Sequence, residues 1–548
     1  MIKILAQLSI YFVFHSALIA QVSQQWLNPY YGSGSGNNYS YAIKLDNSGN
    51  VLVTGSVWTN FTNYEDFGTI KYSSEGTQLW PARRYNGTGS NYDHSRAIAI
   101  DANNNVYVTG ESWGGSSLND IAIVKYNPNG DTIWTRRFNS SINGNEYSNS
   151  IAVDQAGNVY VAGESSNTGT LQDFILLKHN SFGTLLWSHT YNGSANGNDE
   201  AVKVCIDNSG NAYVTGYVRE TSSGPDIITI KYDSTGAEQW VRKYNGPGND
   251  ADYGRSIAID LQGNVYVAGE SVGIGSGFDY VLIKYNSAGQ EQWVSRYNGT
   301  QNGNEFLTAL YVDNYGQIYI SGGSTGSKNA FDYATIKYSS LGDQLWSARY
   351  NGPKDSVDYS SALAVDTLGN VYVTGYSEGS SPTFAFDFAT IKYNSDGFEQ
   401  WIQRYNGQGS KNDYATGIAV DNSGGVYVTG YSVGTNNYHN FITIKYQQNT
   451  TDIISEKELQ PKDFALIQNY PNPFNPSTKI SWQSPVGSHQ TLKVYDVLGN
   501  EVATLVDEYK TAGSYEVDFD AAGLSSGVYF YRLQSGSFVE SRKMILIK

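Results

Sequence analysis

The feature that most constrains this chain is an internal repeat of about 53 residues. Each copy opens with an aspartate in the phrase D-x-x-G-N-V-Y-V-x-G, and successive copies are separated by 55, 53, 53, 53, 53, 53 and 55 residues. Short β runs repeated at such a period are typical of propellers and related arrays. The eight repeated aspartates are Asp46, Asp101, Asp154, Asp207, Asp260, Asp313, Asp366 and Asp421.

Each repeat contains four predicted strands. In residues 93–139 they are Ser95–Asp101, Val106–Glu111, Asp120–Tyr126 and Thr132–Phe138, all rich in β-branched and aromatic residues. Four strands per repeat predict the blade of a β-propeller, so the fold class is all-β.

Two connections within the repeat keep a constant length. A glycine follows the opening aspartate at the third position in every copy except the second, which has Asn104. The lysine of I-K-Y is followed by glycine at plus five and tryptophan at plus nine in the first seven copies. Insertions therefore enter only the connection between strands 2 and 3 and the connection between repeats. These two lie on one face of a four-stranded meander, and variable loops on a rigid scaffold commonly carry binding sites.

The repeat tryptophans predict how the array closes. Trp26 precedes the first repeat aspartate by 20 residues, the spacing of nearly every later repeat tryptophan, while the last repeat ends at Tyr446 without one. The N-terminal strand is therefore expected to supply the fourth strand of the last blade, giving an eight-bladed β-propeller over residues 21–447. A seven-bladed ring with a stray repeat would leave sheet edges uncovered.

Composition limits the classes of function. The 51 acidic and 35 basic residues give a net charge of −16, which argues against binding nucleic acid because phosphates need a basic surface. The single cysteine, Cys205, lies in an apolar run and is interpreted as a core thiol.

The N-terminus has the pattern of an export signal. Lys3 precedes an apolar run from Ile4 to Ile19, which predicts a cleaved signal peptide over residues 1–20. A retained membrane helix is the alternative, but polar residues interrupt a stretch already short for a span. No later stretch is apolar enough to cross a bilayer as a helix, so no spanning segment is expected after cleavage.

The phrases D-x-x-G-N-V-Y-V-T-G and I-K-Y-N-x-x-G resemble the bacterial propeller-repeat family known as SBBP, over roughly residues 24 to 447. That family is named for seven blades, so the count of eight departs from its name. The resemblance implies a propeller fold and no particular activity.

A second domain is predicted after a polar linker at residues 448–463. Residues 464–548 contain about six short strand signals, which suggest a small immunoglobulin-like β-sandwich. The motifs of this tail resemble the type A sorting domain of the type IX secretion system, and an ordinary accessory sandwich is the alternative. The matching residues include Asn469, Pro471, Asn472, Pro473, Phe474, Asn475, Pro476, Gly527, Tyr529, Lys543 and Lys548.

This resemblance implies passage through the type IX machinery, then release or attachment at the outer surface of a Gram-negative, Bacteroidetes-type bacterium. The predicted localisation is therefore secreted or cell-surface.

Two sets of acids recur. One set precedes strand 1. Its members are weak Ca²⁺ candidates, since Ca²⁺ takes oxygen ligands, and the alternative is structural turn-capping or solvated charge. No other cofactor is expected. The other set opens strand 3 and is expected to form an ion pair with the lysine five residues later. The calcium candidates are Asp93, Glu146, Asp199, Asp252, Glu305, Asp358 and Asp413.

Aromatic residues near the strand 2–3 connections are candidate ligand platforms for sugar rings or protein side chains. The alternative is that they pack between neighbouring blades. The candidates are Trp58, Trp113, Tyr64, Phe278, Phe331, Phe386 and Tyr438.

These observations favour non-catalytic binding of a glycan or protein through the variable-loop face. The phrase Y-[ND]-x-x-G-x-x-x-W resembles the repeat of quinoprotein dehydrogenases, which keeps an oxidoreductase as one alternative, although the single cysteine cannot make their vicinal disulfide. No nucleophile motif or metal-ligand spacing is present. A purely structural surface-layer component is the other alternative.

Overall fold

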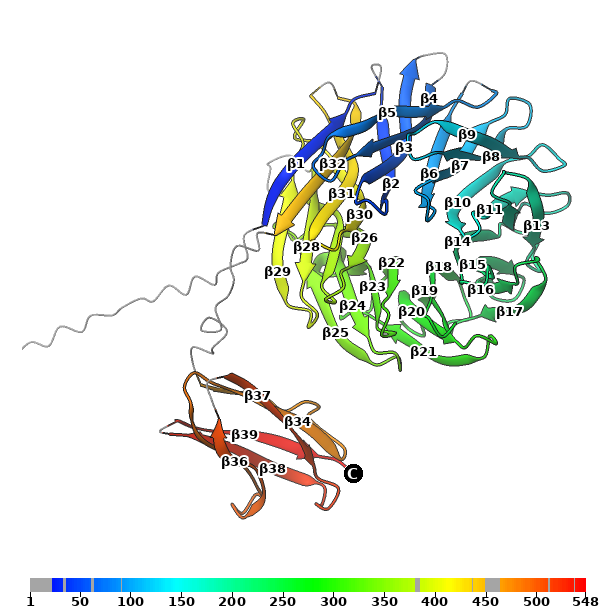
Figure 1. The fold of residues 1–548 in the computed structure, drawn as a ribbon. Helices are drawn as coiled ribbons and strands as arrows, with labels where there is room; N and C mark the ends of the chain where they lie inside the picture. The colour runs from blue at the N-terminus through cyan, green and yellow to red at the C-terminus, as the bar shows by residue number, and fades with distance from the viewer. Residues whose placement is uncertain are drawn as a thin grey trace, which may run out of the picture. The chain divides into compact units, whose positions relative to one another are not determined.

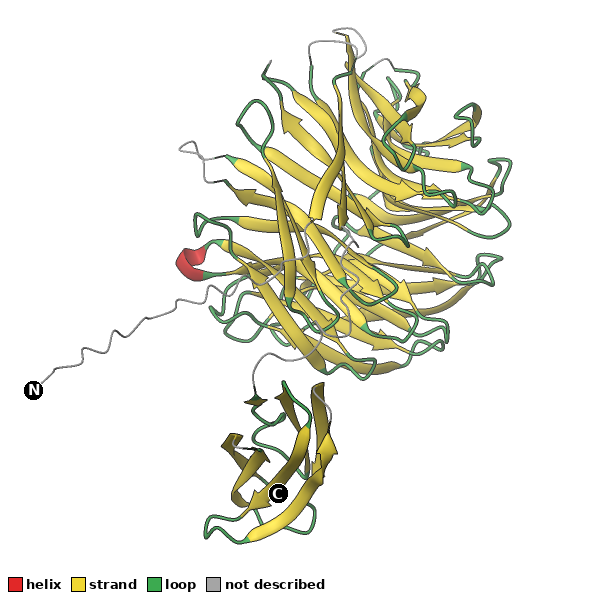
Figure 2. Ribbon diagram, turned by 60° about the vertical axis from the view of Figure 1, so that its left-hand side comes forward, coloured by secondary structure: helices red, strands yellow, loops and turns green. Residues whose placement is uncertain are grey.

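The computed structural model describes residues 22–32, 36–60, 64–89, 91–379, 385–435, 437–448, 464–510, 513–536 and 538–548. The chain divides into two compact units, one ending at Gln448 and the other at Lys548. The described residues form β-strands and a single helical element, the 3-10 turn η1 (Ser327–Asn329) (Figure 2). The predicted signal peptide and all of the predicted linker except Gln448 lie outside the described residues.

In the first unit, the described residues form eight antiparallel four-stranded sheets. Figure 1 shows them around a common centre, with the first strand of each repeat innermost. Sheets one to four are β2 (Asn38–Leu45), β3 (Val51–Asn60), β4 (Tyr64–Tyr72) and β5 (Gln78–Tyr85); β6 (Asp93–Ile100), β7 (Val106–Trp113), β8 (Asn119–Tyr126) and β9 (Thr132–Phe138); β10 (Glu146–Val153), β11 (Val159–Ser166), β12 (Gln172–His179) and β13 (Leu185–Tyr191); β14 (Glu200–Ile206), β15 (Ala212–Glu220), β16 (Gly224–Tyr232) and β17 (Glu238–Tyr244). Sheets five to eight are β18 (Asp252–Ile259), β19 (Val265–Val272), β20 (Phe278–Tyr285) and β21 (Glu291–Tyr297); β22 (Glu305–Val312), β23 (Ile318–Thr325), β24 (Phe331–Tyr338) and β25 (Gln344–Tyr350); β26 (Asp358–Val365), β27 (Val371–Glu378), β28 (Phe386–Tyr393) and β29 (Glu399–Tyr405); β30 (Asp413–Val420), β31 (Gly425–Val433), β32 (His439–Gln448) and β1 (Val22–Tyr30).

The repeat aspartate closes the hairpin between the first two strands of each sheet. Asp260 Oδ1 accepts the backbone N–H of Gln262 at 3.0 Å, and its Oδ2 accepts the hydroxyl of Tyr266 at 3.0 Å. Gly263 has φ +78°, and Asn104 adopts φ 62° at the same place in the second sheet. The left-handed conformation explains why glycine or asparagine stands there.

The repeat tryptophan and lysine join each sheet to the next. Trp134 Nε1–H donates to the carbonyl oxygen of Ser181 at 3.0 Å, and Lys125 Nζ donates to the same oxygen at 3.1 Å. That carbonyl belongs to the hairpin between the last two strands of the following sheet. The constant spacing of these residues thus reflects a contact between sheets.

The N-terminal strand β1 completes the eighth sheet. It pairs antiparallel with β32, and Trp26 lies opposite Lys445 as other repeat tryptophans lie opposite their lysines. Trp26 Nε1–H and Lys445 Nζ both donate to Ser74 O of the first sheet at 3.0 Å. The innermost strands β30 and β2 are also in contact.

Apolar side chains fill the space between neighbouring sheets. Leu176 of the third sheet shares a buried cluster with Val214 and Ile230 of the fourth. Val53 of the first sheet shares another with Phe441 of the eighth. Because each sheet buries both faces, its second and third strands are almost continuously buried.

The second unit consists of two sheets around one apolar core that includes Trp482, Leu492, Tyr531 and Met544. In one sheet β33 (Ala465–Leu466), β34 (Ser477–Ser484) and β37 (Gly513–Asp520) pair, and the other follows the order β36 (Glu501–Lys510), β35 (Ser488–Tyr495), β38 (Gly527–Ser535) and β39 (Phe538–Leu546).

The proline-rich segment of this unit lies along its last strand. Phe474 is buried, its N–H donates to Ile545 O at 2.9 Å, and its own carbonyl accepts the N–H of Ile547 at 3.0 Å. Asn472 Oδ1 accepts the N–H of Ile545 at 2.9 Å, and Asn469 Nδ2 donates to Thr478 Oγ1 at 2.9 Å. These contacts hold the C-terminal strand to the start of the unit.

Candidate functional site

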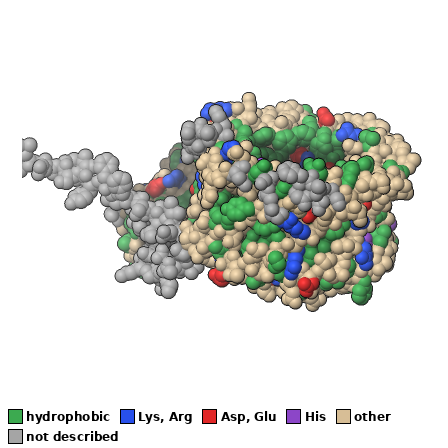
Figure 3. Space-filling view, turned by 90° about the horizontal axis from the view of Figure 1, so that it is seen from above, with side chains coloured by type: hydrophobic (Ala, Val, Ile, Leu, Met, Phe, Trp, Pro, Cys, Tyr) green, Lys and Arg blue, Asp and Glu red, His purple; other side chains and the backbone are tan. Residues whose placement is uncertain are grey.

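The connections of variable length share one end of the sheets. Residues 114–118 join β7 to β8, residues 139–145 join the second sheet to the third, and both leave from the end opposite the hairpin at 101–105. We call the end with the variable connections the loop face and the opposite end the turn face. On the side seen in Figure 3, charged side chains are scattered among uncharged and hydrophobic ones.

The seven acids weighed as calcium candidates lie at the inner start of each first strand, and each is at most 1% exposed. Asp93 Oδ2 accepts the N–H of Gly87 at 2.7 Å, and Asp199, Asp252, Asp358 and Asp413 accept the equivalent glycine N–H at 2.5–2.7 Å. These carboxylates therefore close the loops between sheets. Among the described residues, no group of three or more His, Cys, Asp or Glu side chains could hold a metal ion.

Burial raises the pKa of several of these acids. The pKa of Glu146 rises to about 7, and those of Asp252 and Asp413 rise to about 6. Asp66, which opens the third strand of the first sheet, reaches about 7 through burial and the nearby charge of Asp93.

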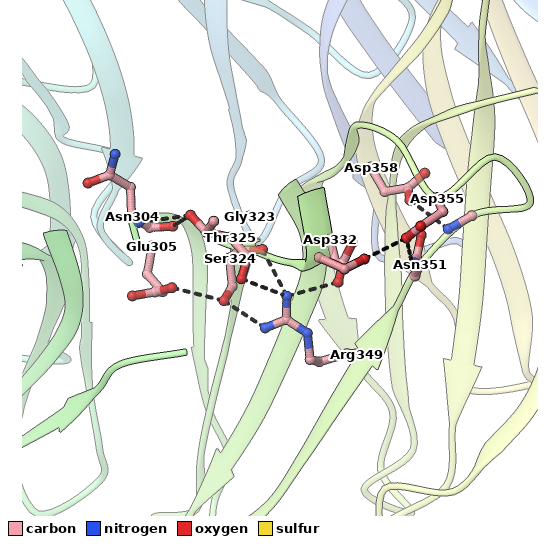
Figure 4. Close-up of polar contacts among 12 residues, drawn as sticks. Asn304, Glu305, Gly323, Ser324, Thr325, Asp332, Arg349, Asn351, Asp355 and Asp358 are labelled. Carbon is pink, nitrogen blue, oxygen red and sulfur yellow. Dashed lines mark hydrogen bonds and ion pairs between the residues drawn. The ribbon is translucent and has the colours of Figure 1, made fainter. Parts of the chain in front are cut away.

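In each of four sheets, an arginine on the outermost strand pairs with the acid near the start of the third strand. In the sixth sheet Arg349 Nη2 lies 2.9 Å from Asp332 Oδ2 and donates to Ser324 O at 2.9 Å, while Ser324 Oγ donates to Glu305 at 3.0 Å (Figure 4). Arg137, Arg296 and Arg404 repeat this ion pair and the bond to the serine carbonyl in sheets two, five and seven.

The expected ion pair between the acid opening strand 3 and the lysine five residues later is wrong. An odd separation places the two side chains on opposite faces of a strand. Lys71 Nζ instead lies 2.8 Å from Asp46 Oδ2 of the hairpin turn, and the strand-3 acids of four sheets pair with arginine.

The two tryptophans proposed as ligand platforms lie at the ends of second strands and are partly buried. Trp58 packs against Gly36 and meets Tyr64 edge-on at 6.0 Å between ring centroids. Trp113 packs against Gly89 in the connection that leads into its own sheet. Each ring therefore covers a glycine at the loop face.

A continuous row of aromatic side chains follows the inner strand ends from the fourth sheet to the first. Phe278 meets Phe306 of the next sheet at 5.6 Å and Phe331 meets Tyr359 at 5.8 Å, within the range of favourable ring contacts. Every member is partly buried, so part of each ring stays accessible to solvent. We call this row the aromatic arc: Tyr217, Tyr253, Phe278, Phe306, Phe331, Tyr359, Tyr376, Phe386, Tyr414, Tyr431 and Tyr39.

The proposed residues Phe278, Phe331 and Phe386 open third strands and contact the next sheet, so they are members of the arc. In the eighth sheet His439, one residue after Tyr438, takes this place and meets Tyr39 at 5.0 Å. None of the other eight members was predicted as a site residue. For five of them the signal was an aromatic directly after the acid or Asn38 at the start of the first strand, as in Asp358-Tyr359: Tyr39, Tyr253, Phe306, Tyr359 and Tyr414.

Ionisable side chains line the inner strand ends of the first five sheets, and we call these the charged arc. His94 lies between Glu65 and Glu111, at 3.0 and 3.1 Å. Burial opposes its charge, yet hydrogen bonds to the two glutamates outweigh burial and raise the pKa of His94 to about 9. Arg96 pairs with Glu111 at 2.6 Å. The arc comprises Glu65, His94, Arg96, Glu111, Glu164, Glu200, Arg255 and Glu270.

A cavity of about 230 Å³ opens within the charged arc, lined by Arg96, Glu111, Tyr147, Asn149 and Glu164. Burial and the charges of Glu200 and Glu111 raise the pKa of Glu164 to about 8. Glu164 therefore tends to keep its proton at neutral pH.

A larger cavity, about 760 Å³, lies on the turn face between the hairpins of sheets six to eight. Tyr311 and Tyr315 line it, and Tyr315 is 83% exposed. The turns on this face keep a constant length, so the repeat spacing did not indicate this cavity.

Family models match both parts of the chain. The Beta-propeller repeat model, SBBP, matches residues 83–116, 133–169, 239–274, 345–381 and 400–439. The Secretion system C-terminal sorting domain matches residues 468–548. The resemblances to the SBBP repeat and to the type IX sorting domain are confirmed.

A curated relative is an uncharacterised WD repeat-containing protein of Acanthamoeba polyphaga mimivirus, 22% identical over 471 residues. The match covers 72% of this chain and 29% of that protein's length.

Solved structures with similarity include PorZ, a surface component of the type IX secretion system of Porphyromonas gingivalis, at 13% identity and TM-score 0.31, covering 93% of this chain and 81% of PorZ. A protein of unknown function from Dyadobacter fermentans gives 8% identity and TM-score 0.41, covering 78% and 99%. Likenesses this weak carry no inference about function.

Within the part of the chain that the structure describes, no helix is long and apolar enough to span a membrane. A sorting tail of the type IX system implies secretion to the cell surface and engagement of that machinery. This chain carries SBBP β-propeller repeats followed by a type IX secretion system C-terminal sorting domain.

Proposed function

We propose that the mature protein is a closed eight-bladed propeller, joined by a linker to an immunoglobulin-like sorting sandwich, that binds an extracellular ligand without catalysis. The pairing of β1 with β32, and the shared contact of Trp26 and Lys445 with Ser74, support closure between the eighth and first sheets. The proposed boundaries are 1–20 for the signal peptide, 21–447 for the propeller, 448–463 for the linker and 464–548 for the sorting domain.

The observation that carries the binding proposal is the aromatic arc. Its partly buried rings lie at the inner strand ends on the loop face, where aromatic side chains give large contact area with little loss of conformational entropy. The adjoining charged arc supplies hydrogen-bonding groups within the same circle. A glycan or a protein segment that stacks on the rings while bonding to polar groups suits this arrangement.

The sorting domain supports a site of action outside the cell, and we propose that the protein is either attached to the outer surface or released. No nucleophile–base pair is evident among the groups of the charged arc, and this favours binding over catalysis. A quinoprotein-like oxidoreductase and a purely structural surface component are the alternatives.

The test is an array of glycans and extracellular proteins probed with the secreted chain, with and without Ca²⁺. A reproducible hit that Tyr414→Ala weakens at least about tenfold supports the proposal. Tyr315→Ala, a matched tyrosine truncation on the turn face, serves as the control. A hit lost equally in both variants, or no hit in either calcium condition, would contradict a ligand site on the aromatic arc.

A further inference from the structure

The eighth sheet keeps the acceptors of the arginine site but lacks the arginine. In the seventh sheet Arg404, on the outermost strand, donates to Ser377 Oγ at 2.6 Å, Ser377 O at 2.9 Å and the Tyr350 hydroxyl at 2.8 Å, and pairs with Asp387 at 3.0 Å. Arg296 makes the same four contacts in the fifth sheet. The guanidinium recurs in this way in the second, fifth, sixth and seventh sheets, whereas Thr190 and Lys243 stand at this position in the third and fourth.

Strand register identifies the equivalent positions in the eighth sheet. Arg404 lies opposite Ala389, three residues before the repeat lysine, and Pro29 lies opposite Ile442, three residues before Lys445. Proline at this place supplies neither charge nor a donor. The acceptors persist as Tyr405, Ser432 and Asn440, with asparagine in place of aspartate.

A cavity of about 270 Å³ occupies the place of the missing side chain, and Pro29, Tyr31, Tyr405, Ser432 and Asn440 are among its lining residues. Ser432 and Asn440 are each 3% exposed, so the acceptors lie at the bottom, while Tyr31 is 54% exposed. The volume is below the roughly 300 Å³ at which pockets for drug-sized ligands begin, so it suits a single side chain.

A buried carboxylate lies beside this cavity. In the second sheet Asp93 and Arg137 Nη1 both lie beside Gly87, and Asp413 takes the place of Asp93 beside Gly407. Asp413 is 0% exposed, and its Oδ1 has no hydrogen-bond partner, as is also true of Asp252 Oδ1 and Asp358 Oδ1 in sheets that hold the arginine.

Burial governs the pKa of these carboxyl groups. Nearby arginines lower the pKa of Asp93, Asp252 and Asp358 against the effect of burial. Burial raises the pKa of Asp413 to about 6, the same value that Asp252 reaches beside Arg296.

We propose that this cavity is a receptor for the guanidinium group of an arginine side chain presented by a partner protein. Ser432 and Asn440 would accept its N–H groups in the fork geometry that the second, fifth, sixth and seventh sheets display. Asp413 would supply the opposite charge, and the exposed ring of Tyr31 would cover the stem. A lysine ammonium lacks the planar fork that this acceptor set matches. The cavity lies by the outermost strand of its sheet, so this proposal does not depend on the aromatic arc.

The test is calorimetric titration of the full secreted chain with N-acetyl-arginine amide and, separately, N-acetyl-lysine amide. We expect saturable binding of the arginine probe, roughly tenfold tighter than the lysine probe. Asn440→Asp should strengthen binding, because it restores the aspartate of the other sheets. Pro29→Arg should abolish binding, because the site then holds its own guanidinium, whereas Tyr315→Ala on the turn face should leave it unchanged.

A second measurement does not depend on the folding of the Pro29→Arg variant. Arg404→Ala empties the equivalent site of the seventh sheet and should lower the Tm, and millimolar ethylguanidinium should restore part of that loss while ethylammonium does not. Equal binding of both probes, or no saturable arginine binding that Asn440→Asp improves, would overturn the proposal.

Discussion

Truncation of Trp26 tests whether β1 belongs to the propeller as its scaffold contacts indicate. The indole lies 6.1 Å from the ring of Tyr72 and 6.0 Å from that of Tyr427, and its N–H donates to Ser74 O at 3.0 Å. Its ring also packs under Gly76 of the first sheet. Trp26→Ala thus removes contacts with both the eighth and the first sheets.

The expected cost follows from these contacts. Truncating a large aromatic side chain costs about 3 kcal/mol when it is partly rather than fully buried, and the lost hydrogen bond adds about 1 kcal/mol. For a domain of this size we expect a fall in Tm of about 5 °C. Trp134→Ala is the matched control, because Trp134 makes the same contacts between the second and third sheets.

Differential scanning calorimetry of both variants of the secreted chain measures the two costs under identical conditions. If β1 completes the eighth sheet, the two costs should agree to within about 1 kcal/mol. A Trp26→Ala protein that melts with the wild type, while Trp134→Ala is destabilised, would refute closure through β1.

Three further outcomes are expected. The pKa of Glu164 lies above its unfolded value, so its contribution to stability is present below the unfolded pKa and is lost as pH rises through about 8. Glu164→Gln should therefore raise the free energy of unfolding by on the order of 2 kcal/mol, and with it the Tm, at pH 8.5 but not at pH 4. A pH-independent effect would contradict this assignment. Asp260→Ala should cost about 2 kcal/mol in urea unfolding, since two backbone N–H groups and a tyrosine hydroxyl lose their acceptor, and a change below about 0.5 kcal/mol would contradict it. Deleting residues 464–548 should leave the propeller in the periplasm on cell fractionation, and continued surface display would contradict the sorting role.

Much of the scaffold could be predicted because the repeat encodes local geometry. The spacing from Asp260 to Gly263 is that of a tight turn, so turn chemistry alone identified the hairpin. Trp26 was informative because it stands 20 residues before the repeat aspartate, which placed β1 in the eighth sheet before any pairing was known. Such signals are read within one repeat.

The candidate site was harder to predict because its contacts join different sheets. Phe278 was recognised as an aromatic near a connection, but only the packing of neighbouring sheets shows that it stacks against Phe306. The partner of Asp332 was missed for a related reason. Arg349 lies 17 residues away on another strand, and the lysine only five residues away appeared the nearer choice.

The second residue of each innermost strand decides which chemistry the inner strand ends present. This position, the one directly after the acid or Asn38, is tyrosine or phenylalanine in six sheets, but His94 stands there in the second and Glu200, the first residue of β14, in the fourth. The turn aspartates and the lysine contacts between sheets recur without involving this residue, so the scaffold does not dictate it. At Glu200 the row of rings stops, and the hydroxyl of Tyr217 at 2.7 Å and the amide of Asn149 at 2.9 Å donate to the carboxylate instead. Tyr217 is also the first ring of the aromatic arc, so the two arcs meet at Glu200, as they do where the Arg255 guanidinium lies 5.0 Å from the ring centroid of Tyr253.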